Sequence, residues 1–451
     1  MTGRYKAYPE YKDSGIEWLK DMPTHWQLTR AKHLFKRVQR PVRPEDGIVT
    51  AFRDGEVTLR SNRRVDGFTN AAKEIGYQGV RKGDLLVHAM DGFAGAIGMS
   101  DSDGKCSPVC SVCVPWESGV VDTEYYGYLV RQLAVTDFIT SLAKGIRERS
   151  TEFRFGEFSA LPLAVPPYIE QQKIANFLSH ETAKIDTLIT KQEKLIELLK
   201  EKRQAVISHA VTKGLNPDVP MKDSGVEWLG EVPEHWVVSK FAYLKKVLTD
   251  YTANGSFADL KANVEYRDTP SFARLVRLTD LRVDLNNENG VWIDEESYQY
   301  LSKSALYGGE FLLANVGAYA GLFYQMPFNK GPASLAPNMF MAKFNSKKVK
   351  REFMAYIGQS EGVSGQLKLS ATASSAQPKL NKDDFKCVQF AYPNIREQLK
   401  IVAYLDKELP KIDLLISKQT KAISLMKERR TALISAAVTG RIDVRDWQES
   451  A

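Results

Sequence analysis

The chain has 451 residues, 43% of them hydrophobic, which is enough for roughly two to four domains with sizeable cores. It contains no apolar run near the roughly 20 residues that span a bilayer, its first residues lack the apolar core of a signal peptide, and four cysteines are too few for a disulfide scaffold. These features exclude membrane-spanning and disulfide-stapled proteins and predict a soluble, cytoplasmic one, while the net charge of +7 permits nucleic-acid binding without requiring it.

The first predicted element is a box, "KDSGIEWLKDMPTHW", at residues 12–26, and a near copy, "KDSGVEWLGEVPEHW", lies at residues 222–236. A second block, "KGDLLVHAMDGFAGAIG" at 82–98, is similar to "GGEFLLANVGAYAGLFY" at 308–324. Both blocks read as a polar turn, a short apolar strand and a small-residue turn that contains Ala-Gly. Because the blocks recur in the same order, the sequence predicts a tandem duplication.

A globular segment follows each box, over residues 27–165 and 237–391. Short strand-like runs such as "DLLVHA" and "FLLANV" are separated by Gly, Asn and Asp turns, and helical stretches such as "TEYYGYLVRQLAVTDFITSLAKG" lie between them. The pattern predicts an α+β fold for each segment.

Basic residues gather in the predicted loops of both segments. Arg and Lys in loops can neutralise phosphates, and some can contact guanine in the major groove. The candidate DNA contacts of the first segment are Arg60, Arg63, Arg64, Arg147 and Arg149. Those of the second segment are Arg274, Arg277, Lys368 and Lys379. For any single member of these groups, a solvated surface base remains the alternative interpretation.

Each half ends in a helical block, which begins at Pro166 in the first half and at Tyr392 in the second. In the first block, apolar side chains fall at positions 185, 188, 195, 199 and 206, and the second block shows the same spacing. This 3-4 spacing is typical of a coiled coil, although two amphipathic helices packed on separate domains remain the alternative. We expect two long helices that lie antiparallel and relate the two halves by a pseudo-twofold axis.

A proline inside the second helical block, Pro410, stands where the first block has Ala183. Proline is tolerated in the first turn of a helix but not in its interior. Each block is therefore predicted to divide into a short and a long helix. The expected short helices span about 170–180 and 395–408, and the long ones about 183–212 and 410–438.

Three cysteines, Cys106, Cys110 and Cys113, have the spacing with which radical enzymes hold an iron–sulfur cluster. They lead into "CSVCVPW", whose alternation places successive side chains on opposite faces of a strand, and the second half has no cysteine at the corresponding place. Buried structural thiols are therefore expected, with no metal site.

The chain also lacks the residues of a catalytic site. Pro166-Pro167-Tyr168 is similar to the target-base loop of an amino-methyltransferase, but Val165 stands where a polar residue is needed. There is no Gly-rich cofactor loop and no Walker A sequence. His25 and His235 each precede a Trp of the repeated box, so we expect packing rather than chemistry from them. No catalytic, cofactor-binding or metal-binding residue is predicted.

Three paired motifs together resemble the specificity subunit of type I restriction–modification systems. They are the "KDSG-x-EWL…P-x-HW" boxes, the Pro-x-x-x-Glu-Gln helix starts ("PYIEQQKI", "PNIREQLKI") and the "KID-x-LI-x-KQ" heptads that lead to "EKRQAVISHAVT" and "ERRTALISAAVT". Their order and duplication match over essentially the whole chain, whereas the two globular segments carry no local match.

On this resemblance the fold class is α+β, with two globular α/β target recognition domains separated by two long helices that form an antiparallel coiled coil. The expected parts are target recognition domain 1 with the first box (1–165), helical spacer region 1 (166–214), target recognition domain 2 with the second box (215–392), helical spacer region 2 (393–440) and a tail (441–451).

The resemblance implies a non-catalytic subunit for which each recognition domain binds one half of a bipartite site on double-stranded DNA, while the coiled coil sets the unread spacer. It implies two modification subunits, which use S-adenosylmethionine to methylate adenine N6, and restriction subunits that need ATP and Mg. The chain itself is expected to bind no cofactor. A bifunctional enzyme is one alternative, and a structural or restriction-blocking coiled-coil protein without sequence-selective DNA binding is another.

Overall fold

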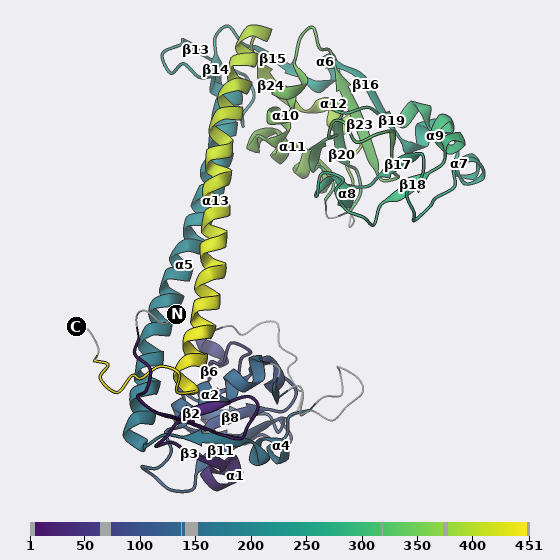
Figure 1. The fold of residues 1–451 in the computed structure, drawn as a ribbon. Helices are drawn as coiled ribbons and strands as arrows, with labels where there is room; N and C mark the ends of the chain where they lie inside the picture. The colour runs from purple at the N-terminus through teal and green to yellow at the C-terminus, as the bar shows by residue number, and fades with distance from the viewer. Residues whose placement is uncertain are drawn as a thin grey trace. The chain divides into compact units, whose positions relative to one another are not determined.

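The computed structural model describes residues 5–63, 74–136, 138–139, 152–317, 319–372 and 378–448. The chain divides into two compact units (Figure 1). Unit 1 comprises Met1–Glu193 and Thr420–Ala451, and unit 2 comprises Lys194–Gln419. Unit 1 is thus assembled from two separate stretches of chain, whereas unit 2 is one continuous stretch. None of the described helices is long and apolar enough to cross a membrane.

The centre of unit 1 is a four-stranded antiparallel sheet with the strand order β4-β11-β8-β9. Because neighbouring side chains alternate across a strand, Leu85 and Val87 of β8 face one core and Leu86 faces another. Helix α2 covers the first of these faces with Tyr125 and Leu129. The side chain of Asp122 caps this helix by accepting a hydrogen bond from the backbone N–H of Tyr125.

The elements of unit 1 that precede its long helix are β1 Tyr11–Asp13, β2 Asp21–Pro23, β3 Gln27–Arg30, α1 Ala31–Leu34, β4 Phe35–Val38, β5 Val49–Ala51, β6 Val57–Leu59, η1 Arg60–Asn62, β7 Gln78–Val80, β8 Leu85–His88, η2 Gly92–Ala94, β9 Ile97–Met99, β10 Gly104–Cys106, β11 Cys110–Pro115, α2 Thr123–Val135, α4 Phe155–Ala160 and β12 Pro162–Val165.

Unit 2 has a corresponding four-stranded sheet, with the order β16-β23-β20-β21, and α10 covers one of its faces. Phe311 and Leu313 of β20 face α10, while Leu312 faces the opposite way. On that opposite side unit 2 carries a second sheet, β18-β17-β22-β19, in which β17 and β22 are parallel. No four-stranded sheet corresponds to it among the described residues of unit 1.

The elements of unit 2 between its two long helices are β13 Met221–Asp223, β14 Glu231–Pro233, β15 Val237–Lys240, α6 Phe241–Leu244, β16 Lys245–Asp250, η3 Tyr251–Asn254, α7 Phe257–Asn263, β17 Ala273–Val276, α8 Leu278–Leu281, β18 Val291–Ile293, α9 Glu295–Tyr300, η4 Ser302–Ser304, β19 Ala305–Leu306, β20 Phe311–Ala314, β21 Phe323–Gln325, β22 Ala333–Leu335, β23 Met339–Phe344, α10 Arg351–Gln359, α11 Glu361–Thr372, α12 Lys382–Cys387 and β24 Gln389–Tyr392.

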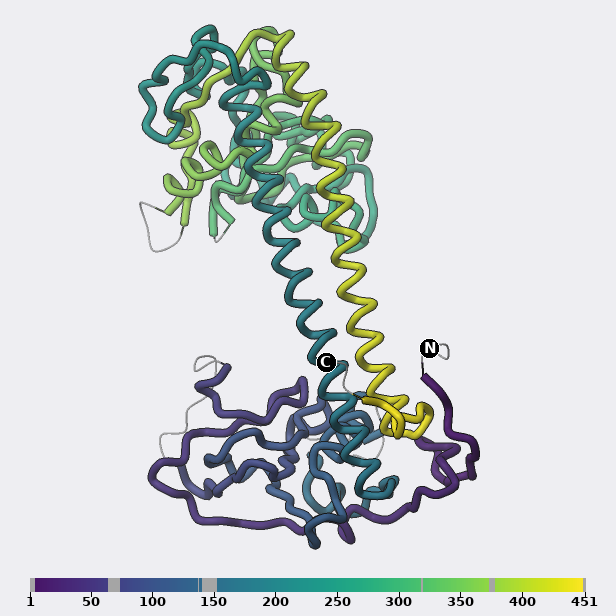
Figure 2. Tube along the Cα trace, turned by 90° about the vertical axis from the view of Figure 1, so that its left-hand side faces the viewer, coloured from purple at the N-terminus to yellow at the C-terminus, as the bar shows by residue number. Residues whose placement is uncertain are grey.

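Two long helices, α5 (Tyr168–Lys213) and α13 (Ile395–Val438), contribute to both units. In unit 1 the first half of α5 packs against the last half of α13, through Ile185 of α5 and Leu433 of α13. In unit 2 the last half of α5 packs against the first half of α13, through Ile207 and Leu405. The two helices are antiparallel in each unit (Figures 1 and 2), so the predicted α+β fold with an antiparallel coiled coil is confirmed.

The predicted division of each helical block into a short and a long helix is wrong. Helix α5 is continuous over 46 residues, and α13 is continuous over 44 residues with Pro410 in its interior. A proline removes one backbone hydrogen bond from a helix. Leu405, Leu409 and Ile412 are buried on either side of Pro410, and this apolar contact offsets the loss.

The two stretches of unit 1 join near the end of α13 (Figure 2). The backbone N–H of Asp443 donates to the carbonyl oxygen of Lys6 at 2.7 Å. The guanidinium of Arg445 lies 5.0 Å from the centre of the Tyr8 ring, and the Trp447 ring contacts Phe177 edge-on at 5.6 Å between centroids. Residues before the first box and after α13 therefore share one core with the start of α5.

Candidate nucleic-acid interface

The box of the first half is anchored to the long helix by one carboxylate. Glu170, in the first turn of α5, accepts a hydrogen bond from Trp26 Nε1 at 2.8 Å and one from the Tyr8 hydroxyl at 2.5 Å. His25 Nε2 lies 2.8 Å from the other carboxylate oxygen. Burial raises the pKa of Tyr8, and the neighbouring Glu170 raises it further, so the phenol stays protonated as a donor.

The second half repeats this anchor at the start of α13. Glu397 accepts from Trp236 Nε1 at 3.1 Å, and His235 Nε2 lies 2.7 Å from its other oxygen. We expected packing from His25 and His235, but their side chains are 39% and 47% exposed and each contacts a carboxylate instead. The Glu of each Pro-x-x-x-Glu-Gln motif is therefore the acceptor that fixes the box to the long helix.

The Gln of the same motif attaches the globular segment of each unit to the long helix. We call these segments, residues 27–165 and 237–391, the heads. Gln171 Oε1 accepts from the backbone N–H of Asp122, and Gln398 Oε1 accepts from that of Lys350, each at 2.8 Å. The side-chain amide of Gln171 also donates to the carbonyl of Pro166, just before the helix. Both glutamines are buried, so these hydrogen bonds are shielded from water.

A matched ion pair joins the long helices in each unit. In unit 1, Arg430 Nε lies 3.0 Å from Asp186 Oδ1, and in unit 2 Arg203 Nε lies 2.9 Å from Asp413 Oδ1. The two aspartates, like the two arginines, occupy equivalent positions of the duplication. We call the long helices with these Glu, Gln and Asp–Arg contacts the frame. The frame is therefore built twice from the same contacts.

The predicted DNA contacts of the first half have different surroundings. Arg63 is held by Asp54 and Glu56 and lies over the Phe52 ring at 4.3 Å. Arg60 Nε donates to the Thr50 hydroxyl at 2.9 Å. Their contact with DNA stays a prediction. The candidates Arg64, Arg147 and Arg149 lie outside the described residues.

In the second half, the structure contradicts the prediction that Arg274 contacts DNA. Its side chain is only 6% exposed, and its guanidinium donates to Asp280, to Asn287 Oδ1 and to the carbonyl of Leu285. It lies in a fully buried strand, β17, so it stabilises the core and cannot reach a phosphate.

Arg277 shares Asp280 with Arg274 but is 39% exposed. Burial raises the pKa of Asp280, but hydrogen bonds from Arg277 and Asn287 outweigh it, and the net pKa is lowered. Lys368 on α11 and Lys379 before α12 are exposed. DNA contacts by these three residues stay predictions.

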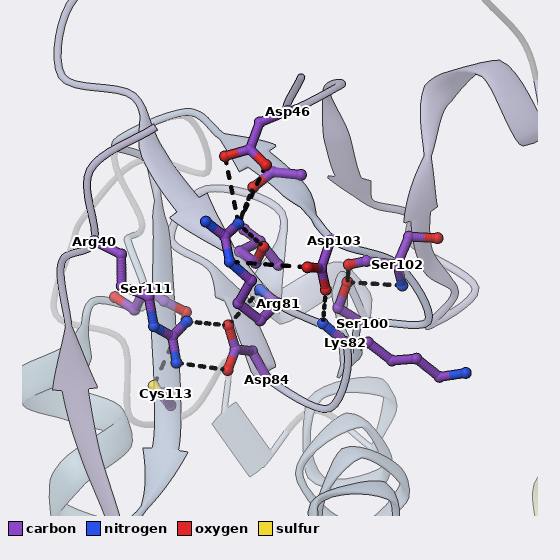
Figure 3. A network of polar contacts seen from close by, with 12 residues as sticks. Arg40, Asp46, Arg81, Lys82, Asp84, Ser100, Ser102, Asp103, Ser111 and Cys113 are labelled. Atoms are coloured by element: carbon purple, nitrogen blue, oxygen red, sulfur yellow. Dashed lines mark hydrogen bonds and ion pairs between the residues drawn. The ribbon is translucent and has the colours of Figure 1, made fainter. Parts of the chain in front are cut away.

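Other arginines of unit 1 are structural (Figure 3). Arg40 makes a two-point ion pair with Asp84, whose carboxylate also accepts from the backbone N–H of Arg81. The Arg81 guanidinium lies 3.3 Å from Asp46, and both acids are buried. These contacts fix the turn that leads into β8.

The cysteine triplet does not have the geometry of a metal centre. Cys106 and Cys110 pack in the core on one face of the central sheet, while Cys113 packs in the core on the other face. Burial raises the pKa of Cys113 to about 12, which favours the neutral thiol over a metal-binding thiolate. Within the described part of the chain, no group of three or more His, Cys, Asp or Glu side chains is placed to hold a metal.

A family model described as type I restriction modification DNA specificity domain matches residues 276–423. The type I restriction enzyme StySPI specificity subunit of Salmonella potsdam is 20% identical over 387 residues, which cover 84% of this chain and 78% of that protein. The EcoKI specificity subunit of Escherichia coli (strain K12) is 19% identical over the same extent.

Solved structures show the same fold. A chain from a study of complex assembly and conformational transition of the type I R-M system has a TM-score of 0.67 at 14% identity, and the match covers 92% of this chain and 98% of that one. The HsdS subunit of Thermoanaerobacter tengcongensis has a TM-score of 0.50 at 15% identity, with 95% and 100% covered. In its matching family model and in these relatives, the chain is similar to the specificity subunits of type I restriction–modification systems.

Proposed function

We propose that this chain is the non-catalytic DNA-reading subunit of a type I restriction–modification complex. Each globular head binds one half of a bipartite site on double-stranded DNA. The observation that carries the proposal is one frame, built twice, that holds two different heads. Glu170 and Glu397 bind their boxes in the same way, and Gln171 and Gln398 bind their heads in the same way.

The heads differ where the frame does not. Both contain the central four-stranded sheet, but unit 2 adds the mixed sheet β18-β17-β22-β19 and the two helices α7 and α9. A duplication that preserves its anchors while its heads diverge is expected of a reader whose two half-sites differ. Base contacts depend on the side chains that reach the groove, so divergent heads imply an asymmetric target.

The two long helices set the number of unread base pairs between the half-sites, because α5 and α13 are both unbroken and both contribute to each unit. Two modification subunits bind the chain and methylate adenine N6 with S-adenosylmethionine, and restriction subunits use ATP and Mg to cleave unmethylated DNA. A cytoplasmic location follows from this role.

The test is to map N6-methyladenine in the DNA of a host that expresses this chain with its modification subunit. We expect methylation at one bipartite sequence with a fixed spacer. Replacing residues 27–165 with the corresponding segment of another such subunit should change one half-site and leave the other intact. A matched insertion of one heptad into both α5 and α13 should lengthen the spacer and preserve both half-sites.

Three results would contradict the proposal. If both half-sites changed after the segment exchange, the two heads would not be independent readers. If the purified chain methylated DNA without a partner, it would be an enzyme itself. If the complex with the modification subunit bound DNA without sequence preference, the structural or restriction-blocking alternative would stand.

A further inference from the structure

The duplication preserves one edge of each head as well as the frame. In unit 1, Ala89 follows β8 and joins two other segments. Its backbone N–H donates to the carbonyl of Val109 at 2.9 Å, and its carbonyl accepts from the N–H of Phe153 at 2.7 Å. Three stretches of chain, after β8, before β11 and before α4, therefore meet at one edge of the sheet.

Unit 2 makes the same three-way junction. Asn315 follows β20, its N–H donates to the carbonyl of Asn338 at 3.1 Å, and its carbonyl accepts from the N–H of Leu380 at 2.8 Å. The segments are those after β20, before β23 and before α12, which are the equivalents of the three in unit 1. We name this feature the three-segment edge, formed by residues 89–91, 108–109 and 152–154 in unit 1 and by 315–317, 337–338 and 378–380 in unit 2.

The side chains at this edge differ between the units although the backbone hydrogen bonds are the same. In unit 1 the edge lines a cavity of about 370 Å³ together with Arg37 of β4. Arg154, 72% exposed and paired with Glu152, lines the same cavity, and Met90 beside it is 48% exposed. An arginine fork and an exposed apolar side chain are the groups that read guanine edges and thymine methyl groups.

In unit 2 the same edge carries a lysine and amides. Lys379 is exposed, and its backbone bridges to Val316. The side-chain oxygen of Asn315 is buried and has no hydrogen-bond partner among the described residues. Tyr319, 45% exposed, lies just beyond the edge with the Arg282 guanidinium 3.9 Å from its ring centre. Both edges are therefore polar and partly cationic, but with different donors and acceptors.

Arg37 differs from the other arginines of the same sheet region. Arg40 and Arg81 are bound by Asp84 and Asp46, as described above. The Arg37 side chain is exposed and makes no hydrogen bond or ion pair with any residue in the part of the chain that the structure describes, although its backbone pairs with Cys113 in the sheet. A long cationic side chain without a partner is free to take one from a ligand.

We propose that the three-segment edge, together with Arg37 of β4 that lines the same cavity in unit 1, reads the bases of each half-site, with Arg37 the specificity-determining residue of unit 1 and Lys379 that of unit 2. The inference rests on the proposed function, because it places the base contacts of a DNA reader. A constant backbone holds the edge at the same place in both heads, and the variable side chains on it give each head its own sequence.

The test compares Arg37→Gln with Lys36→Gln, in the complete chain bound to its modification subunit. The two residues are neighbours on β4, so they lie on opposite faces of the strand, and each substitution removes one positive charge. Binding is measured by competition against duplexes in which each base pair of the target is varied. Arg37→Gln should lower the preference for one base pair of one half-site by roughly 5- to 150-fold, whereas Lys36→Gln should weaken all duplexes equally.

The matched pair in unit 2 is Lys379→Gln and Lys347→Gln. Lys347 is exposed in the turn that follows β23 and lies outside the three-segment edge, whereas Lys379 is part of that edge. Lys379→Gln should change the other half-site, and Lys347→Gln should change neither. If Arg37→Gln does not assemble, Arg37→Lys replaces it: the charge is kept but the two-pronged donor is lost, so selectivity at the same base pair should fall.

The outcomes separate this inference from the proposed function. A wild-type complex that selects a bipartite site, together with an Arg37→Gln complex that behaves like Lys36→Gln, overturns the assignment of the edge but leaves the function intact. A change in both half-sites from Arg37→Gln also overturns it. A wild-type complex with no sequence preference overturns the proposed function itself.

Discussion

The most direct test of the duplicated frame is to remove its two carboxylate anchors, one at a time. Glu170→Ala deprives two buried donors, Trp26 Nε1 and the Tyr8 hydroxyl, of their acceptor. Glu397→Ala deprives one buried donor, Trp236 Nε1. The histidine of each anchor is exposed enough to turn to water, so it adds little to either cost.

The expected magnitudes follow from the number of buried donors. A buried hydrogen-bonding group left without its partner costs about 1–3 kcal/mol. Glu170→Ala should therefore destabilise unit 1 by about 2–6 kcal/mol, and Glu397→Ala should destabilise unit 2 by about 1–3 kcal/mol. The exposed Glu201 of α5 gives the control, because Glu201→Ala should change either unit by less than about 0.5 kcal/mol.

The assay is hydrogen exchange of the complete chain, followed by mass spectrometry as urea is raised. Peptides from α2 report the opening of unit 1 and peptides from α10 report that of unit 2, so the two free energies are obtained separately. A loss below about 1 kcal/mol from either substitution would refute the argument that these acceptors hold the boxes in place.

Three further outcomes are expected. The lowered pKa of Asp280 means that its ion pairs contribute stability above the unfolded value of 3.8, and that this stability is lost as the pH falls through the lower folded value. Asp280→Asn should therefore flatten the acid side of the stability profile of unit 2, and an unchanged profile would contradict this. A double-mutant cycle on Asp186 and Arg430 should give a coupling of about 0.3–1 kcal/mol that disappears in high salt, because the pair is partly exposed. A coupling that salt leaves unchanged would count against a solvent-accessible pair. Treatment with a chelator should leave the melting temperature unaltered, since the thiols of Cys106 and Cys113 face different cores, and a lower melting temperature would point to a structural metal.

The duplication, the antiparallel helices and the helix starts at the Glu-Gln motifs could be predicted because each depends on local pattern. A heptad needs only its own spacing to indicate a helix pair. The pattern could not show how the buried side chains around one residue change that residue's effect on the structure. Pro410 predicts a helix break by its own chemistry, but the buried leucines beside it keep α13 intact.

Arg274 shows the same limit at the candidate interface. Its charge suggested DNA, yet its neighbours Ala273 and Leu275 are buried, and so is every residue of β17. The apolar run around it was the signal that it belongs to a core strand. The three-segment edge left no sequence signal, because residues about 60 positions apart in the chain, such as Ala89 and Phe153, meet only in the folded sheet.

The composition of unit 1 from two separate stretches has a consequence for synthesis of the protein. Every residue of unit 2 has been made once Gln419 leaves the ribosome, so this unit can complete its core while the chain is still growing. The core of unit 1 needs Leu433, Ala437 and Val444, which are translated only after all of unit 2. The head that is made first is therefore the one that completes its core last, and until then the apolar side chains of α5 in unit 1, such as Ile185 and Ile189, lack their partners on α13.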